Sequence, residues 1–198
     1  MPNWCDTTYK CVGDPKEVRL LHKAIKANDK RKTSRVPNGF GRLWLGNIID
    51  QLGGDWEKYR CRGEITDYYL EPDGTMLTIY QCTAWCEQEG FRQLIEEKFP
   101  SIKVYYREEE PGCEVYYTND DTGDYFPERY FLDSYDAVDE PYFETIEEAA
   151  ECVSGIVGKK VEANVGAIKD ALDEYTEQEE EKGEDVFFSF HEFTVVND

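Results

Sequence analysis

The sequence predicts an α+β protein in which helices pack on one antiparallel sheet, and three observations support this fold class. Strand-like and helix-like segments alternate in the order β-α-β-β-α-β as far as Tyr117. A Pro-Asp-Gly turn joins the two middle strands. An apolar fraction of 40% beside 33% charged residues is typical of a folded chain with a well-solvated surface.

The first strand-like run covers residues 4–12, and Asp14-Pro15 then gives the start of a helix, with Asp14 as N-cap. Val18, Leu21 and Ile25 follow at helical spacing with Lys and Arg between them, which predicts an amphipathic helix with a basic outer face. A loop over residues 28–41 comes next. A short helix at about 42–53 is predicted as an insertion before the second strand.

Strands at residues 63–70 and 75–83 are predicted to form a hairpin around Glu71-Pro72-Asp73-Gly74. A second helix is predicted at 87–99, because its apolar residues recur at helical spacing and Pro100 ends it. Strands at 102–106 and 114–117 follow, and 125–132 adds another. This order is the split unit of a ferredoxin-like βαββαβ sheet with added strands.

The C-terminal part is predicted to hold helices at 145–157 and 159–182 and a final strand at 186–196. In the second helix, an apolar seam lies opposite an acidic face. We predict that this seam packs on the chain's own sheet, because its five positions span only about two heptads of a coiled coil. The predicted division is a ferredoxin-like domain at 1–135 and an acidic helical extension with the final strand at 136–198, packed on the same domain. The seam residues are Val161, Val165, Ile168, Leu172 and Tyr175.

Charge is unevenly distributed along the chain. Residues 1–63 hold 13 Lys and Arg against 7 Asp and Glu, whereas residues 64–198 hold 9 against 36. Either the basic segment lies across acidic surface of the same chain, or each patch is a separate binding face. The candidate basic face is Lys23, Lys26, Lys30, Arg31, Lys32 and Arg35. The candidate acidic face is Glu174, Glu177, Glu179, Glu180, Glu181 and Asp185.

The seven cysteines are odd in number and scattered, which favours free thiols in a reducing compartment. The sequence lacks a secretory signal and any run of about 18 apolar residues, so we expect a cytoplasmic protein that does not bind membranes. Cys82 and Cys86 lack the spacing of a zinc or redox motif, and only two histidines accompany them. No metal or other cofactor is therefore predicted.

Motifs of catalysis and nucleotide binding are also missing. Gly39-Phe40-Gly41 does not continue as a dinucleotide fingerprint, and neither histidine stands in a catalytic motif. With 43 carboxylates, a close acidic pair is expected by chance and is no evidence for an enzyme. Strand tyrosines could stack on RNA bases, but the acidic charge of the sheet-bearing region disfavours nucleic acid as a partner.

Two sequence blocks resemble the YubB-type ferredoxin-like family. The first is Met1-Pro2-Asn3-Trp4-Cys5, and the second runs from Cys82-Thr83-Ala84-Trp85 through a helix and a strand to Glu114-Val115-Tyr116-Tyr117. The resemblance covers about residues 1–12 and 63–118. It implies the fold and a place among accessory proteins of plasmids, phages and conjugative elements, without a settled activity. The motif residues carried over are Pro2, Asn3, Trp4, Cys5, Thr83 and Trp85.

Trp4 and Trp85 should be neighbours, since the first and third strands are adjacent in such a sheet. We predict a packed aromatic pair in the core, because Trp buries a large area. The alternative is a shared pocket at one sheet edge.

These observations favour a non-enzymatic interaction protein of a bacterial mobile element that uses its acidic surface against a basic protein partner. One alternative is a DNA mimic that inhibits a nucleic-acid-binding enzyme. Others are nucleic-acid binding through the basic face and an enzyme whose site is not visible in the sequence. The partner and the oligomeric state are not predicted.

Overall fold

The computed structural model describes residues 3–135, 138–139 and 141–197 and has a mixed α+β architecture with two compact units. Unit 1 contains the residues up to Asp120 together with those from Val196 onwards, and unit 2 runs from Asp121 to Val195. The sequence-based boundary after residue 135 falls inside unit 2, directly after its first strand.

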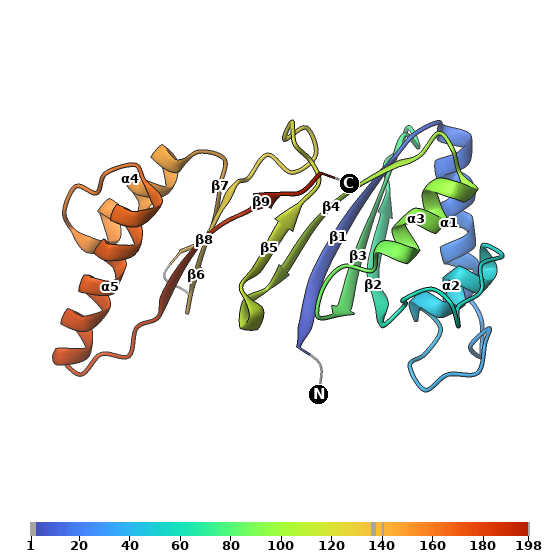
Figure 1. The fold of residues 1–198 in the computed structure, drawn as a ribbon, viewed down its shortest axis with the longest axis horizontal. Helices are drawn as coiled ribbons and strands as arrows, with labels where there is room; N and C mark the ends of the chain where they lie inside the picture. Colours follow the sequence, from blue (N-terminus) through green and yellow to red (C-terminus); the bar gives the residue numbers. More distant parts are fainter. Residues whose placement is uncertain (1–2, 136–137, 140, 198) are drawn as a thin grey trace. The chain divides into compact units, whose positions relative to one another are not determined.

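The larger sheet has six strands among the described residues and is mostly antiparallel. Unit 1 contributes five of them in the order β2-β3-β1-β4-β5 (Figure 1). The sixth, β9 (Thr194–Val195), directly precedes Val196, whose N–H donates to the carbonyl oxygen of Thr118 at 2.8 Å. The strands of unit 1 are β1 (Trp4–Val12), β2 (Gly63–Leu70), β3 (Met76–Ala84), β4 (Lys103–Glu110) and β5 (Val115–Thr118).

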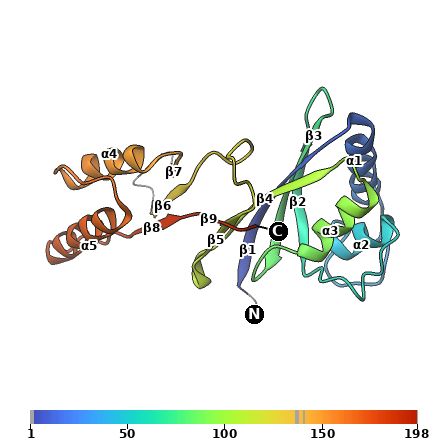
Figure 2. The same cartoon turned by 45° about the horizontal axis from the view of Figure 1, so that its top comes forward.

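The helices of unit 1 cover one face of this sheet, as Figures 1 and 2 show. They are α1 (Pro15–Asp29), α2 (Leu45–Gln51) and α3 (Glu89–Lys98). α1 begins as predicted, with the Asp14 side chain accepting from the N–H of Lys16. The core between helices and sheet includes Tyr9, Leu21, Ile79 and Phe91, all fully buried.

The predicted hairpin is confirmed. The N–H of Gly74 donates to the carbonyl of Glu71, and the N–H of Glu71 donates to the carbonyl of Met76. Gly74 has φ +83°, a conformation that glycine adopts without steric cost. The predicted inserted helix at 42–53 corresponds to α2, and buried Asn47 of α2 ties the preceding loop down by accepting from the N–H groups of Arg35 and Val36.

In its described residues, unit 2 is a small three-stranded antiparallel sheet packed with two helices. The sheet has the order β7-β6-β8, with β6 (Tyr130–Ser134), β7 (Tyr142–Phe143) and β8 (Phe188–Glu192). The helices are α4 (Ile146–Val157) and α5 (Val165–Glu181). Ile168 and Leu172 of α5 pack in one core with Leu132 and Phe190 of the sheet, so the seam packs within the chain as predicted.

Three sequence-based boundaries in this region are wrong. α5 begins at Val165 rather than 159, because the side chain of Asn164 caps it by accepting from the N–H of Ala167. The strand expected at 125–132 lies at 130–134. The run at 186–196 forms β8 and β9 rather than one strand, and between them Phe193 is buried and donates its N–H to the carbonyl of Arg129.

Candidate binding surfaces

The adjacent ends of β1 and β3 bring the family-motif residues together. Cys5 pairs with Thr83 and Trp4 with Ala84, and the N–H of Trp85 donates to the carbonyl of Asn3 at 3.0 Å. Pro2 lies outside the described residues. The motif therefore gathers five of its six residues at one end of the sheet.

Trp4 and Trp85 are not a packed core pair, so that prediction is wrong. Trp4 is 53% exposed and Trp85 is 41% exposed. Trp4 alternates with buried Cys5, so its side chain is on the sheet face opposite the helices. Trp85 follows the last residue of β3 and has φ +75°, which turns the chain out of the sheet.

A pocket of about 390 Å³ opens on the face opposite the helices. Trp4, Phe40 and Trp44 form its aromatic lining. The ring centroids of Phe40 and Trp44 are 5.8 Å apart, and Trp44 is held beside β2 by a bridge to Glu64. The other lining residues are Arg62, Gly63, Glu64, Cys82 and Ala84. Trp85 is not among the lining residues, so this pocket contains Trp4 but is not the predicted pocket shared by the two tryptophans.

Two carboxylates lie close to this pocket, since Glu64 lines it and Asp6 is the cross-strand partner of the lining residue Cys82. Cys82 pairs with Asp6 on one side and with Glu64 on the other, and direct cross-strand partners share a face. Burial raises the pKa of the Cys82 thiol, and the charges of Asp6 and Glu64 raise it further. Arg62 is the only Lys or Arg among the residues lining the pocket within the described chain.

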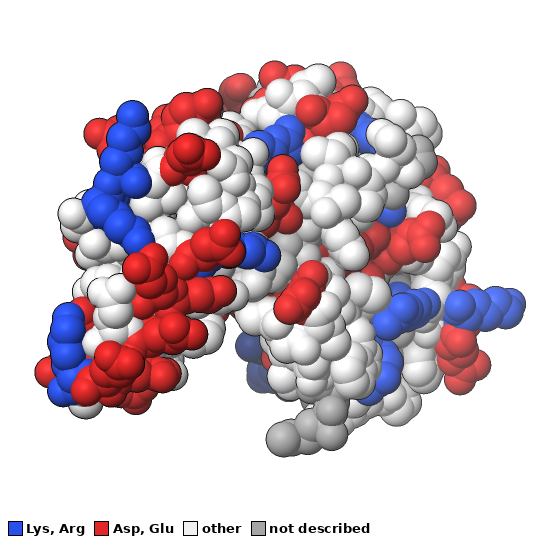
Figure 3. Space-filling view, turned by 60° about the vertical axis from the view of Figure 1, so that its left-hand side comes forward, with Lys and Arg blue, Asp and Glu red and all other residues white. Residues whose placement is uncertain are grey.

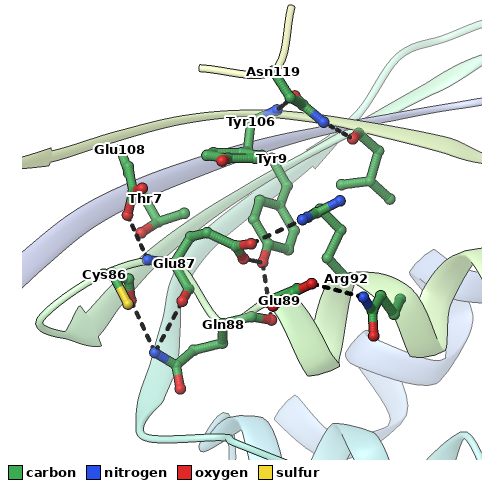
Figure 4. Close-up of polar contacts among 12 residues, drawn as sticks. Thr7, Tyr9, Cys86, Glu87, Gln88, Glu89, Arg92, Tyr106, Glu108 and Asn119 are labelled. Atoms are coloured by element: carbon green, nitrogen blue, oxygen red, sulfur yellow. Dashed lines mark hydrogen bonds and ion pairs between the residues drawn. The ribbon is translucent and has the colours of Figure 1, made fainter. Parts of the chain in front are cut away.

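A buried polar network supports the loop from β3 to α3 (Figure 4). The Tyr9 hydroxyl donates to a carboxylate oxygen of Glu87 at 2.5 Å, and the Arg92 guanidinium contacts the other oxygen at 3.2 Å. Arg92 also stacks over the ring of Tyr106, with 5.2 Å from its central carbon to the ring centroid. Burial raises the pKa of Tyr9 well above its usual value, so its hydroxyl keeps the proton that it donates.

Glu108 is the second buried carboxylate of the network. It accepts from the backbone N–H of Glu87 at 2.5 Å and from the Cys5 thiol at 3.6 Å. Burial raises the pKa of Cys5 to about 12, which keeps the thiol protonated as a donor. Because Glu87, Arg92 and Glu108 are each less than a tenth exposed, they fix the loop before α3 from inside the core.

Unit 2 carries most of the negative charge. Residues 121–195 hold 22 Asp and Glu against 5 Lys and Arg, whereas the rest of the chain holds 21 against 17. The net charges are thus −17 and −4, which sum to the −21 of the whole chain. Figure 3 shows acidic side chains crowded together, with few basic ones among them.

The outer face of α5 is an acidic stripe, which we define as Asp170, Asp173, Glu174, Glu177, Glu180 and Glu181. All six are exposed and recur at helical spacing, opposite the buried Ile168, Ala171 and Leu172. Four of the six predicted acidic-face residues belong to this stripe. Of the other two, Glu179 forms an ion pair with Lys182, and Asp185 is exposed beyond the helix end. Within the stripe, Glu174 pairs with Lys159.

Unit 2 also has an acidic hollow of about 490 Å³. Glu128, Glu144, Glu148 and Glu151 line it beside Tyr142 and Phe143. Glu148 has a structural role there, since its carboxylate accepts from the N–H of Thr145 in the capping box that starts α4. No group of three or more His, Cys, Asp or Glu within the described ranges could hold a metal ion.

The predicted basic face lies on and after α1. Lys23 and Lys26 are exposed on the helix, and Lys30, Arg31 and Lys32 are exposed directly after it. Arg35 differs from the others because its guanidinium pairs with Asp50 of α2 and donates to Gln51 at 2.9 Å.

Several site residues escaped the sequence analysis. Phe40 and Trp44 reach the pocket with Trp4 because the loop before α2 returns to the edge of β2, where Glu64 also lines the pocket. Asp170 and Asp173 extend the acidic stripe, and their helical spacing from Glu177 was a usable signal.

Fold and surfaces together define a mixed α+β protein with two candidate binding surfaces, an aromatic pocket in unit 1 and an acidic stripe in unit 2. Comparison with protein-family models, curated proteins and solved structures finds no match to this chain. No helix in the described part of the chain is long and apolar enough to cross a membrane.

Proposed function

We propose that this is a non-enzymatic interaction protein of a bacterial mobile element that acts in the cytoplasm and binds a basic protein through the acidic stripe. The observation that carries the proposal is the division of α5 into two faces. Its apolar face is buried in the core of unit 2, while its acidic face is exposed. A row of like charges costs stability by self-repulsion, so a role in binding gives a reason for it.

The mobile-element context rests on the YubB-type resemblance together with the topology of unit 1. We infer that unit 1 is a ferredoxin-like domain, because a strand order of β2-β3-β1-β4 with antiparallel neighbours and helices after β1 and β3 is the arrangement expected of a split βαββαβ unit. The motif residues meet at one end of this domain, next to the pocket.

The alternative of DNA mimicry is less well supported by the geometry. From Asp170 to Glu181 the stripe spans roughly 16 Å at about 1.5 Å per residue. A duplex of that length presents about ten phosphates on two strands, at one charge per roughly 1.7 Å. The stripe offers six carboxylates in one row. A single row suits a basic helix or groove of a protein better than it suits a site shaped for a duplex.

The test is quantitative capture from a nuclease-treated bacterial lysate on immobilised protein, with salt elution and mass spectrometry. Three chains are compared: the unaltered protein, a variant with Glu177→Gln, Glu180→Gln and Glu181→Gln, and a control with Glu57→Gln, Glu89→Gln and Glu97→Gln. The control removes the same charge from exposed positions of unit 1.

We expect a basic protein to bind the unaltered chain and the control, to elute at moderate salt because screening weakens the attraction, and to be lost from the stripe variant. Equal retention by the stripe variant would contradict the proposal. Competition by added duplex DNA would instead favour DNA mimicry.

A further inference from the structure

We propose that the aromatic pocket of unit 1 binds an organic cation with an alkylated ammonium head group. This site lies in the other unit and takes another class of ligand than the acidic stripe, so it goes beyond the function proposed above. Three features of the pocket carry the inference: aromatic walls, nearby carboxylates, and a volume suited to one small head group.

The aromatic walls come from separate parts of the chain. Trp4 stands at the start of β1, Phe40 in the loop after α1, and Trp44 at the edge of β2. Phe40 and Trp44 are inclined by 33° with 5.8 Å between their ring centroids. The faces of such rings attract cations electrostatically. Trp4 and Phe40 are more than half exposed, so they have apolar surface left to cover a ligand.

The charge around the pocket selects a cation over a neutral ligand. Glu64 lines the pocket, and Asp6 is the cross-strand partner of Cys82 on the same face. Cys82 lines the pocket between these two carboxylates in the sheet register, and besides burial their charges raise the pKa of its thiol, so both act on the pocket lining. An anionic ligand such as a nucleotide phosphate would be repelled by the same two groups.

Arg62 brings a positive charge to the pocket lining, which disfavours a cationic ligand. Replacing Arg62 therefore tests the proposal. Its backbone is fixed at the pocket wall, where its carbonyl accepts from the N–H of Ala84 at 2.8 Å and its N–H donates to Gln88 at 3.0 Å. Its long side chain is exposed and can extend into solvent while its stem covers apolar surface. The positive charge of Arg62 is unfavourable for a cationic ligand and favourable for an anionic one, so its replacement distinguishes the two.

The volume fits a small head group. At about 390 Å³ the pocket is near the lower end of the range of roughly 300–1,000 Å³ found for small-molecule sites. The head group could belong to a free quaternary ammonium compound or to a methylated lysine side chain, since both present the same chemistry to the rings.

The experiment titrates the full chain with choline and with 3,3-dimethylbutan-1-ol, its uncharged isostere, and follows tryptophan fluorescence and NMR shifts. We expect choline to bind at least tenfold more tightly than the isostere. Equal affinity would overturn the proposal, because the site would then be merely apolar. Tighter binding of adenosine monophosphate than of choline would also overturn it, by pointing to a nucleotide. The trimethyl-lysine side chain in a capped single residue is compared with choline to distinguish the two sources.

Variants locate the site. Trp4→Ala and Phe40→Leu should each weaken choline binding about tenfold, and Glu64→Gln should weaken it several-fold. Arg62→Gln should tighten it, and weaker binding in this variant would contradict a cation site. Trp85→Ala is the matched control, because Trp85 is exposed directly after β3, which supplies Cys82 and Ala84 to the pocket, but does not line the pocket itself. Choline binding by this variant should be unchanged. Trp4 and Phe40 are largely exposed, so their variants are expected to fold.

Discussion

Trp85 has φ +75°, in the left-handed region that costs a residue with a Cβ about 1–2 kcal/mol. The chain accepts this conformation directly before a loop that the buried network holds from inside. Thr83 helps to hold this loop in place, because its hydroxyl donates to the carbonyl of Cys86 at 2.9 Å. An exposed tryptophan in such a conformation indicates that the loop is shaped by its supports rather than by its own propensity.

We predict that Trp85→Gly is more stable than Trp85→Ala by about 1 kcal/mol, since glycine adopts positive φ without steric cost. At Tyr80, an exposed position inside β3, the order should reverse, because glycine weakens a strand. Urea denaturation of the four variants measures both differences. If the alanine variant were the more stable one at both positions, Trp85 would bear no backbone strain in solution.

The buried carboxyl of Glu108 makes the stability of the protein depend on pH. Burial raises the pKa of its carboxyl above the ordinary value of 4.5. Between 4.5 and the raised value the native state therefore holds a proton that the unfolded state has lost. The stabilisation from this group is present at low pH and disappears as the pH rises through that window.

We therefore expect Glu108→Gln, which does not titrate, to gain stability relative to the unaltered protein as the pH is raised from about 4 to about 7. Urea denaturation across this range gives the difference at each pH. Glu97→Gln, at an exposed position, is the control and should follow the unaltered protein in parallel. A constant difference for Glu108→Gln would contradict the shifted pKa.

The exposure of Trp4 could have been predicted from its neighbours, although its pocket could not. Trp4 is in period with Asp6, Thr8 and Lys10, whereas Cys5 is in period with the buried face. The large area of a tryptophan favours burial and so conflicts with this alternation. Its partners Phe40 and Trp44 are distant in the sequence and come from an insertion, so no local pattern could place them beside it.

At the scale of elements, local signals decided what the sequence could predict. The sequence predicts α1, α3 and the hairpin, because caps, Pro and Gly mark their ends. It does not predict the start of α5, because Val161 fits the helical period although it lies before the helix. Val161 is buried, and its N–H donates to the Ser154 hydroxyl, so tertiary packing explains its apolar character.

The N-cap of α5 gives a direct test of its corrected boundary. We expect Asn164→Ala to lower the free energy of unfolding by about 1 kcal/mol, because the N–H of Ala167 loses its acceptor. Asn164→Asp keeps a carboxyl oxygen at this position and should have little effect. Thermal unfolding followed by far-ultraviolet circular dichroism measures both. If Asn164→Ala left the free energy of unfolding unchanged, the helix would start earlier, as the periodicity of the sequence predicts.

In the whole molecule, the larger hydrophobic core and most of the net charge belong to different units. Unit 1 has the larger core and a nearly balanced charge, whereas unit 2 has a net charge of −17 on 75 residues. All four tryptophans, at positions 4, 44, 56 and 85, are in unit 1. Tryptophan fluorescence therefore reports on unit 1 alone, while circular dichroism also reports on α4 and α5.

We predict that salt stabilises unit 2 more than unit 1. Raising the ionic strength from about 0.01 M to about 0.15 M shortens the screening length from roughly 30 Å to roughly 8 Å, which weakens repulsion between carboxylates of the stripe. The unfolding transition seen by circular dichroism should shift to higher temperature, and the tryptophan transition should shift less. The Glu177→Gln, Glu180→Gln and Glu181→Gln variant should show a smaller shift. If salt instead lowered the transition of unit 2, ion pairs such as Lys159–Glu174 would dominate over repulsion, and the stripe would have no unbalanced charge to offer a basic partner.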